Sequence, residues 1–258
     1  MKIESCFSNK IFFLIVFCFL THWVFPQNAQ RPRIITDRPD FTESTDIVPK
    51  GKYQAEFGYT FNKVEKTESP SFGELLVRIP LHQKVEFRLG FNSFVLLNEQ
   101  ANNQSGIQDA TLGLKVNIVE REKLNLAVIG ATLIPSGSNE FGEKEVQPII
   151  ILAAAVPINE KFTLASNGSI SSAYSEQDRF IQGAFSISSG FSLTPKMGIF
   201  FEYFGFFQDS KQGPNVNFIN GGATYLINND LQIDMRVGLG LNGINPEYFV
   251  GVGTGIRI

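Results

Sequence analysis

Charged side chains recur at every second position in several segments of the chain. Glu86 and Arg88 stand between apolar residues, and so do Asp234 and Arg236. Because the side chains of a β-strand alternate between its two faces, each pair lies on one face and its apolar neighbours lie on the other. Carboxylates and guanidinium groups gathered in this way form ion pairs when they are enclosed, or line a solute path and set its selectivity. Both interpretations fit the sequence.

Residues 36–46 hold a second group of charges, which precedes the regular alternation. This stretch carries five charged side chains around Pro39. The proline and the Asp and Thr residues favour irregular, turn-rich structure. The segment is either a solvated leader, or a plug or gate that pairs with Arg236 or Arg257. Its carboxylates match no cation-binding spacing, so we predict no metal site.

Histidine, glycine and carboxylate residues give no recognisable catalytic set. His82 is the one histidine after residue 29. It falls in a short turn, which the barrel predicted below places in the periplasm. That is the wrong end of the barrel for the histidine base of an outer-membrane Ser-His hydrolase. The glycines of residues 251–255 open no helix, so they indicate a crowded strand and not a phosphate loop. Nothing in the sequence brings two carboxylates together as glycosidases require. We therefore predict no enzyme and no cofactor.

The elements that must position the charges are β-strands. In residues 52–62, Tyr53 and Phe57 share one face, whereas Gln54 and Glu56 take the other. This period of two predicts a strand. We predict about 12 such strands, with boundaries that carry an error of roughly two to four residues. They span residues 52–62, 72–81, 83–96, 107–119, 123–134, 146–157, 160–173, 179–193, 196–208, 215–227, 230–242 and 246–258.

Strand length favours a membrane barrel over a soluble β-sandwich. Sandwich strands usually have about five or six residues, whereas about 9 to 11 are needed to cross a bilayer with tilt. The predicted fold class is all-β, an antiparallel transmembrane β-barrel with one lipid-facing side. The connections alternate between short turns, which we place in the periplasm, and longer polar loops. The longer loops are predicted at residues 63–71, 98–106, 135–145, 175–178, 208–214 and 242–246.

The N-terminal residues are typical of an export signal. Lys2 and Lys10 precede or flank an apolar run over residues 11–20, which is short for a membrane-spanning helix of about 20 residues. We divide the chain into a signal peptide (1–29), a periplasmic or lumen-plugging segment (30–51) and an outer-membrane barrel (52–258). Both cysteines lie in the signal, and the chain has 22 Lys and Arg residues against 25 Asp and Glu residues. This mild acidity argues against a nucleic-acid partner.

Several segments resemble a known family. Residues 36–44 read Thr-Asp-Arg-Pro-Asp-Phe-Thr-Glu-Ser, residues 48–59 read Val-Pro-Lys-Gly-Lys-Tyr-Gln-Ala-Glu-Phe-Gly-Tyr, and residues 106–115 read Gly-Ile-Gln-Asp-Ala-Thr-Leu-Gly-Leu-Lys. They are similar to the outer-membrane family labelled "putative MetA-pathway of phenol degradation". The resemblance implies an outer-membrane barrel that is connected by name with uptake of aromatic or other hydrophobic compounds. The chain departs from many such barrels in ending on Ile258 and not on an aromatic residue.

Two functions fit these observations. One is an outer-membrane channel or transporter for small, hydrophobic or aromatic solutes; the other is a non-conducting structural or surface-binding barrel. The expected partners are outer-membrane lipid, the barrel-assembly machinery and, for the first function, a small hydrophobic solute. Phe200, Phe204 and Phe206 share the parity of Glu202, so they either line the solute path or pack against a plug. The candidate lumen or gate residues are Asp37, Arg38, Asp40, Glu43, Glu56, Arg88, Asp109, Lys115, Phe200, Glu202, Phe204, Asp234 and Arg236.

Overall fold

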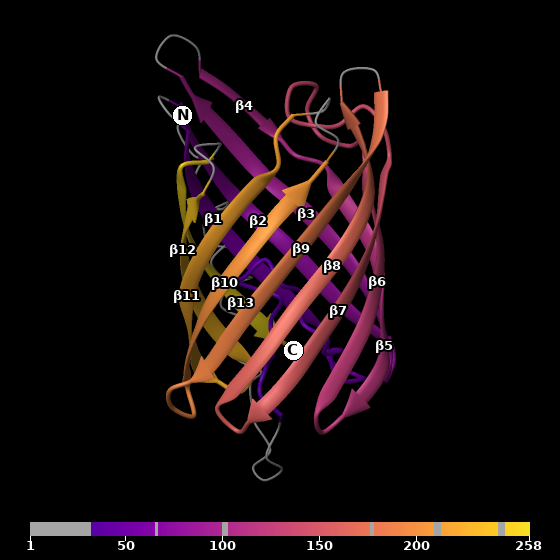
Figure 1. Cartoon of the computed structure of the whole chain (residues 1–258), viewed down its shortest axis with the longest axis vertical. Coiled ribbons are helices and arrows are strands. Elements are labelled where there is room, and N and C mark those ends of the chain that lie inside the picture. The colour runs from indigo at the N-terminus through magenta and orange to yellow at the C-terminus, as the bar shows by residue number, and fades with distance from the viewer. Residues whose placement is uncertain (1–31, 65–66, 100–102, 176–177, 209–212, 242–245) are drawn as a thin grey trace, which may run out of the picture. The chain divides into compact units, whose positions relative to one another are not determined.

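The alternating segments form antiparallel strands in a computed structural model that describes residues 32–64, 67–99, 103–175, 178–208, 213–241 and 246–258. Figure 1 shows these strands tilted around a closed barrel. The predicted signal peptide lies outside the described residues. The strands are β1 (Gln54–Val64), β2 (Thr67–His82), β3 (Val85–Asn98), β4 (Asn103–Ile107), β5 (Ala110–Arg121), β6 (Leu124–Ile134), β7 (Gln147–Asn159), β8 (Phe162–Ser175), β9 (Asp178–Ser192), β10 (Met197–Phe207), β11 (Val216–Asn228), β12 (Leu231–Gly240) and β13 (Tyr248–Arg257).

Pairing between the first and last strands closes the barrel. β1 pairs with β13 from Gln54 opposite Arg257 to Lys63 opposite Tyr248. β4 and β5 both pair with β3, so they occupy one position around the barrel. The described residues therefore form a barrel of 12 strand positions, which confirms the predicted fold and strand number. Closure leaves the sheet without the open edge that a membrane would not tolerate.

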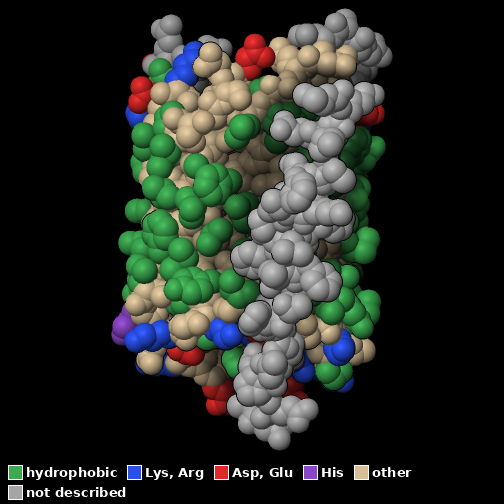
Figure 2. Space-filling model, turned by 180° about the vertical axis from the view of Figure 1, so that it is seen from behind, with side chains coloured by type: hydrophobic (Ala, Val, Ile, Leu, Met, Phe, Trp, Pro, Cys, Tyr) green, Lys and Arg blue, Asp and Glu red, His purple; other side chains and the backbone are tan. Residues whose placement is uncertain are grey.

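The two faces of the wall have opposite chemistry. Ile150 and Phe201 point outwards and are 64% and 61% exposed, whereas Glu56, Arg78 and Lys115 point inwards and are 0% exposed. Figure 2 shows hydrophobic side chains over the middle of the barrel and charged side chains gathered towards its two ends. This is the surface of a transmembrane barrel. In the described part of the chain, no helix has the length and hydropathy to cross a membrane.

Two of the predicted long loops are wrong. β1 and β2 stay paired as far as Val64 opposite Thr67, and β3 and β4 as far as Asn98 opposite Asn103. The connection predicted at residues 175–178 is where β8 ends, at Ser175 opposite Asp178. These hairpins continue past the apolar part of the wall. There both faces of a strand tolerate polar residues, so the loss of apolar alternation does not mark the end of the strand.

Candidate plugged lumen

Residues 34–48, here called the lumen segment, precede β1 and lie inside the barrel, with both ends bound near the short turns. Ile34 donates its N–H to the carbonyl of Asn229 at 2.8 Å, and Val48 donates its N–H to Glu86 Oε2 at 2.9 Å. Thr36, Asp37, Thr42, Thr45 and Val48 are all buried. The segment has irregular structure, so the wall must satisfy many of its polar groups.

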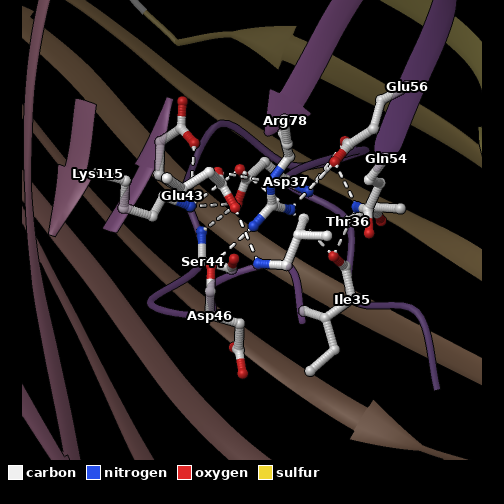
Figure 3. Close-up of polar contacts among 12 residues, drawn as sticks. Ile35, Thr36, Asp37, Glu43, Ser44, Asp46, Gln54, Glu56, Arg78 and Lys115 are labelled. Atoms are coloured by element: carbon white, nitrogen blue, oxygen red, sulfur yellow. Dashed lines mark hydrogen bonds and ion pairs between the residues drawn. The ribbon is translucent and has the colours of Figure 1, made fainter. Parts of the chain in front are cut away.

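Asp37 lies where three cations from three strands meet; Figure 3 shows it beside two of them, Arg78 and Lys115. Lys115 Nζ is 3.0 Å from both oxygens of the Asp37 carboxylate. Arg78 Nη1 is 3.4 Å from Oδ2, and Arg88 Nη1 contacts the same oxygen. Burial alone would raise the pKa of Asp37, but the charges of Arg78, Lys115 and Arg88 hold it well below its usual range. Asp37 is therefore an ionised carboxylate that neutralises this cation cluster, Arg78, Arg88 and Lys115.

The wall supplies only part of the negative charge that the cation cluster requires. Arg78 binds Glu86 Oε1 at 2.9 Å and Glu56 Oε1 at 3.2 Å. The lumen segment adds Asp37 and also Glu43, which accepts a hydrogen bond from Arg88 Nη2 at 2.6 Å. In the described residues, three cations thus meet two carboxylates from the wall and two from the lumen segment. Buried charges are stable only when they are paired. The segment therefore supplies the negative charge that the wall lacks.

Wall carboxylates also bind the backbone of the lumen segment. Glu202 on β10 accepts the N–H groups of Phe41 at 2.9 Å and Thr42 at 2.7 Å, and the Thr42 hydroxyl at 2.6 Å. Asn220 donates to Glu202 Oε2 at 2.7 Å. In the same way, Glu56 accepts hydrogen bonds from the N–H groups of Asp37 and Arg38. Two arginines of the wall donate to carbonyl oxygens of the segment: Arg78 to those of Ile35 and Asp46, and Arg236 to that of Pro39. Charge-assisted hydrogen bonds of this kind are stronger than neutral ones.

Arg38 fits a notch in the wall. Its Nη1 donates to Glu74 Oε2 at 2.7 Å, and its Nη2 is 3.5 Å from Asp234 Oδ1. Gly58 and Gly253 face each other in the β1–β13 pairing, and a Cβ at either position would overlap the Arg38 side chain. The sequence indicated crowding around residues 251–255, but not that the crowding comes from an arginine of the N-terminal segment.

Stacked rings hold the middle of the lumen segment. Phe41 stacks on Phe204, with ring centroids 4.6 Å apart, and Phe204 stacks on Phe218 at 4.8 Å. Phe249 completes this buried cluster. Of the two alternatives considered for Phe204, the structure therefore shows contact with the segment. Aromatic pairs of this geometry contribute about 0.5–1.5 kcal/mol beyond the burial of their area.

Cavities lie on both sides of the lumen segment. The central cavity, about 540 Å³, is lined by Arg38, Phe41 and Glu43 and by an apolar wall that includes Ile129 and Ile151. A polar cavity of about 460 Å³ adjoins it on the side of the long loops and shares its Glu74, Asn92 and Leu133 lining. A third cavity, about 300 Å³, lies on the side of the short turns and meets the central cavity only at Arg38. Residues of the lumen segment therefore line both the central cavity and the cavity on the side of the short turns.

The remaining predicted residues, Asp109, Asp40 and Phe200, contact different parts of the barrel. Asp109 accepts the N–H groups of Ser136 at 2.8 Å, Gly137 at 2.7 Å and Glu143 at 2.6 Å, so it shapes the loop after β6. Asp40 accepts a hydrogen bond from Ser188 at 3.0 Å. Burial and the nearby charge of Glu202 raise the pKa of Asp40 well above its usual range. Phe200 is buried and lines the cavity on the side of the short turns.

Of the two arginines predicted to pair with the segment, Arg236 donates to the backbone carbonyl of Pro39. Arg257 binds Asp230 and donates at 3.4 Å to the carbonyl of Arg33, which precedes the segment. Two of the segment's carboxylates, Asp37 and Glu43, instead contact the cation cluster. Arg78 and Glu86 are absent from the candidate lumen or gate residues, although the alternation already places both on the charged, inward face of β2 and β3.

The geometry defines an antiparallel β-barrel of the outer-membrane type, with the lumen segment bound to the inner face of its wall. The chain belongs to the family described as "Putative MetA-pathway of phenol degradation", whose model matches residues 36–258. The match includes most of the lumen segment as well as the barrel. No curated protein matches the sequence significantly.

Solved structures share the fold. The COG4313 outer membrane channel from Pseudomonas putida F1 superposes with a TM-score of 0.65 at 16% identity, over 83% of this chain and 98% of that chain. The KdgM porin superposes with a TM-score of 0.56 at 8% identity, over 79% of this chain and 98% of that one. The NanC porin gives a TM-score of 0.55 at 8% identity, also over 79% and 98%. These likenesses show an outer-membrane type of barrel, and nothing about the solute.

Proposed function

We propose that the protein is an outer-membrane channel for small solutes with an apolar body, and that the lumen segment is its gate. The observation that carries this proposal is the position of residues 36–43 between cavities that reach towards opposite ends of the barrel. Displacement of these residues joins the cavities into one path. A barrel of about 12 strands lies between the packed eight-stranded and the open 16-stranded sizes, so the path is narrow.

The lining of the central cavity supports the proposed solute class. Ile129, Leu133, Ile149 and Ile151 form an apolar wall on β6 and β7. Pockets for small organic molecules combine such walls with a few convergent polar groups. The family description points to phenol degradation, and the solved structures with this fold are described as a channel and porins. Hydrophobic or aromatic solutes agree with the apolar wall of the cavity and with the family description.

Single-channel recording tests the proposal. The refolded protein from residue 30 should give small, intermittent conductance steps in a planar bilayer, and a variant lacking residues 36–46 should give steps that are several-fold larger. Removal of the segment unites the three cavities, which is the physical reason for the increase. Heat-modifiable migration on a gel serves as the control that both proteins form a barrel. A folded variant that conducts no better than the complete protein would contradict the gate.

The alternative, a non-conducting structural barrel, has one observation in its favour. The lumen segment is held by buried ion pairs with Arg78 and Lys115 and by stacked rings, which suits a permanent filling of the lumen. If neither the complete protein nor the variant lacking residues 36–46 conducts in the same recordings, although both form a barrel, this alternative would be favoured.

A further inference from the structure

We propose that the cation cluster is a carboxylate-binding site of the channel, which Asp37 fills in the closed protein and a small organic anion fills when the lumen segment is displaced. This inference rests on the proposed function and names the charge of its solute. In it, Asp37 acts as an internal substitute for the solute's carboxylate. The solute would have one carboxylate and an apolar body.

The arrangement of the cations is built around an anion. Arg78 and Arg88 are direct partners in the β2–β3 register, and like charges placed opposite each other destabilise a sheet. The Asp37 carboxylate lies between them and also contacts Lys115 on β5. Glu86, the register partner of Lys115, is already engaged by Arg78. The wall alone therefore keeps a positive charge that needs a carboxylate from elsewhere.

The surroundings of the cluster fit an apolar body. Arg88 lines the central cavity together with Ile129, Ile149 and Ile151. A carboxylate at the position of Asp37 would thus place the rest of its molecule along this apolar wall. Glu43, which shares Arg88, belongs to the segment and would leave with it. An aromatic monocarboxylate such as benzoate has the required combination of one charge and one ring.

The test uses the protein from residue 30 with Asp37→Ala, which empties the position while the chain stays complete. Isothermal titration in detergent compares benzoate with benzamide, its neutral isostere. Because hydrogen bonds to charged groups are the stronger ones, we expect benzoate to bind the variant about tenfold more tightly than benzamide does. Adding Arg88→Gln to this variant should remove the preference. The unaltered protein, in which Asp37 competes, should bind benzoate much more weakly.

Asp40→Ala is the matched control, because Asp40 also belongs to the lumen segment but its hydrogen-bond partner is Ser188. It should create no benzoate site. Equal binding of benzoate and benzamide by Asp37→Ala, or binding of neither, would overturn the inference. If Asp37→Ala does not refold, Asp37→Ser also removes the charge and leaves room for a carboxylate, and benzoate should again bind it more tightly than the unaltered protein. Larger conductance on deletion of residues 36–46 without any preference for benzoate would leave the channel standing and refute only the carboxylate site.

Discussion

Replacement of Arg78 by leucine should release the lumen segment and raise the conductance of the barrel. Arg78 donates to the carbonyls of Ile35 and Asp46, near the two ends of the segment, at 3.0 and 2.7 Å. It also binds two wall carboxylates, Glu56 and Glu86, and is fully buried. Breaking a buried ion pair from one side costs about 3–5 kcal/mol, because the remaining charge is left uncompensated. Displacement of the segment lets water reach these carboxylates. The equilibrium between closed and open states should therefore shift towards the open state by about a hundredfold or more.

Single-channel recording measures this gain as the fraction of time spent open. Arg78→Lys is the matched variant, since it keeps the charge but loses the planar fork that reaches several acceptors at once. Its open fraction should lie between those of the unaltered protein and Arg78→Leu. An Arg78→Leu barrel that folds and stays as closed as the unaltered protein would show that these bonds do not hold the segment.

The second large effect is expected for Glu202→Leu, which removes the acceptor for two consecutive N–H groups. The N–H groups of Phe41 and Thr42 both end on this carboxylate. Each buried donor left without a partner costs about 1–3 kcal/mol. The middle of the lumen segment should therefore detach, even though the stacking of Phe41 on Phe204 is untouched.

Limited proteolysis of reconstituted protein reports this detachment, because a freed segment becomes a substrate for cleavage while the barrel resists. Glu145→Leu is the control: its carboxylate pairs with Arg179 at 3.0 Å, and both side chains are about half exposed. It should leave the cleavage pattern unchanged. Equal protection of the segment in Glu202→Leu and in the control would refute the anchoring role of Glu202.

The barrel could be predicted from sequence because its signal is periodic. A charge such as Glu56 or Lys115 on the wrong face would enter lipid, so alternation fixes which side chains point inwards. The same reasoning failed at the ends of the hairpins. At residues 63–71, polar side chains on both faces of a strand resemble a loop, because water reaches both sides there.

The lumen segment could be predicted only as a candidate. Irregular backbone has no period, so nothing in the sequence pairs Asp37 with Lys115, 78 residues further along the chain. The notch at Gly58 and Gly253 depends on the β1–β13 register, which closes only in the folded barrel. The hydrogen bonds that backbone N–H groups donate to Glu202 also cannot be predicted from the sequence, because every residue except proline offers the same donor.

A reversible cross-link tests most directly whether the lumen segment closes the channel. The hydroxyl oxygens of Thr42 and Ser186 are 2.7 Å apart, so cysteines at both positions are well placed to form a disulfide between the segment and β9. The sequence has cysteines only at positions 6 and 18, so the engineered pair carries the only thiols after residue 29. In a planar bilayer, the oxidised Thr42→Cys/Ser186→Cys protein should show no openings, and reduction should restore those of the unaltered protein. Openings that persist while the disulfide is intact would contradict the account.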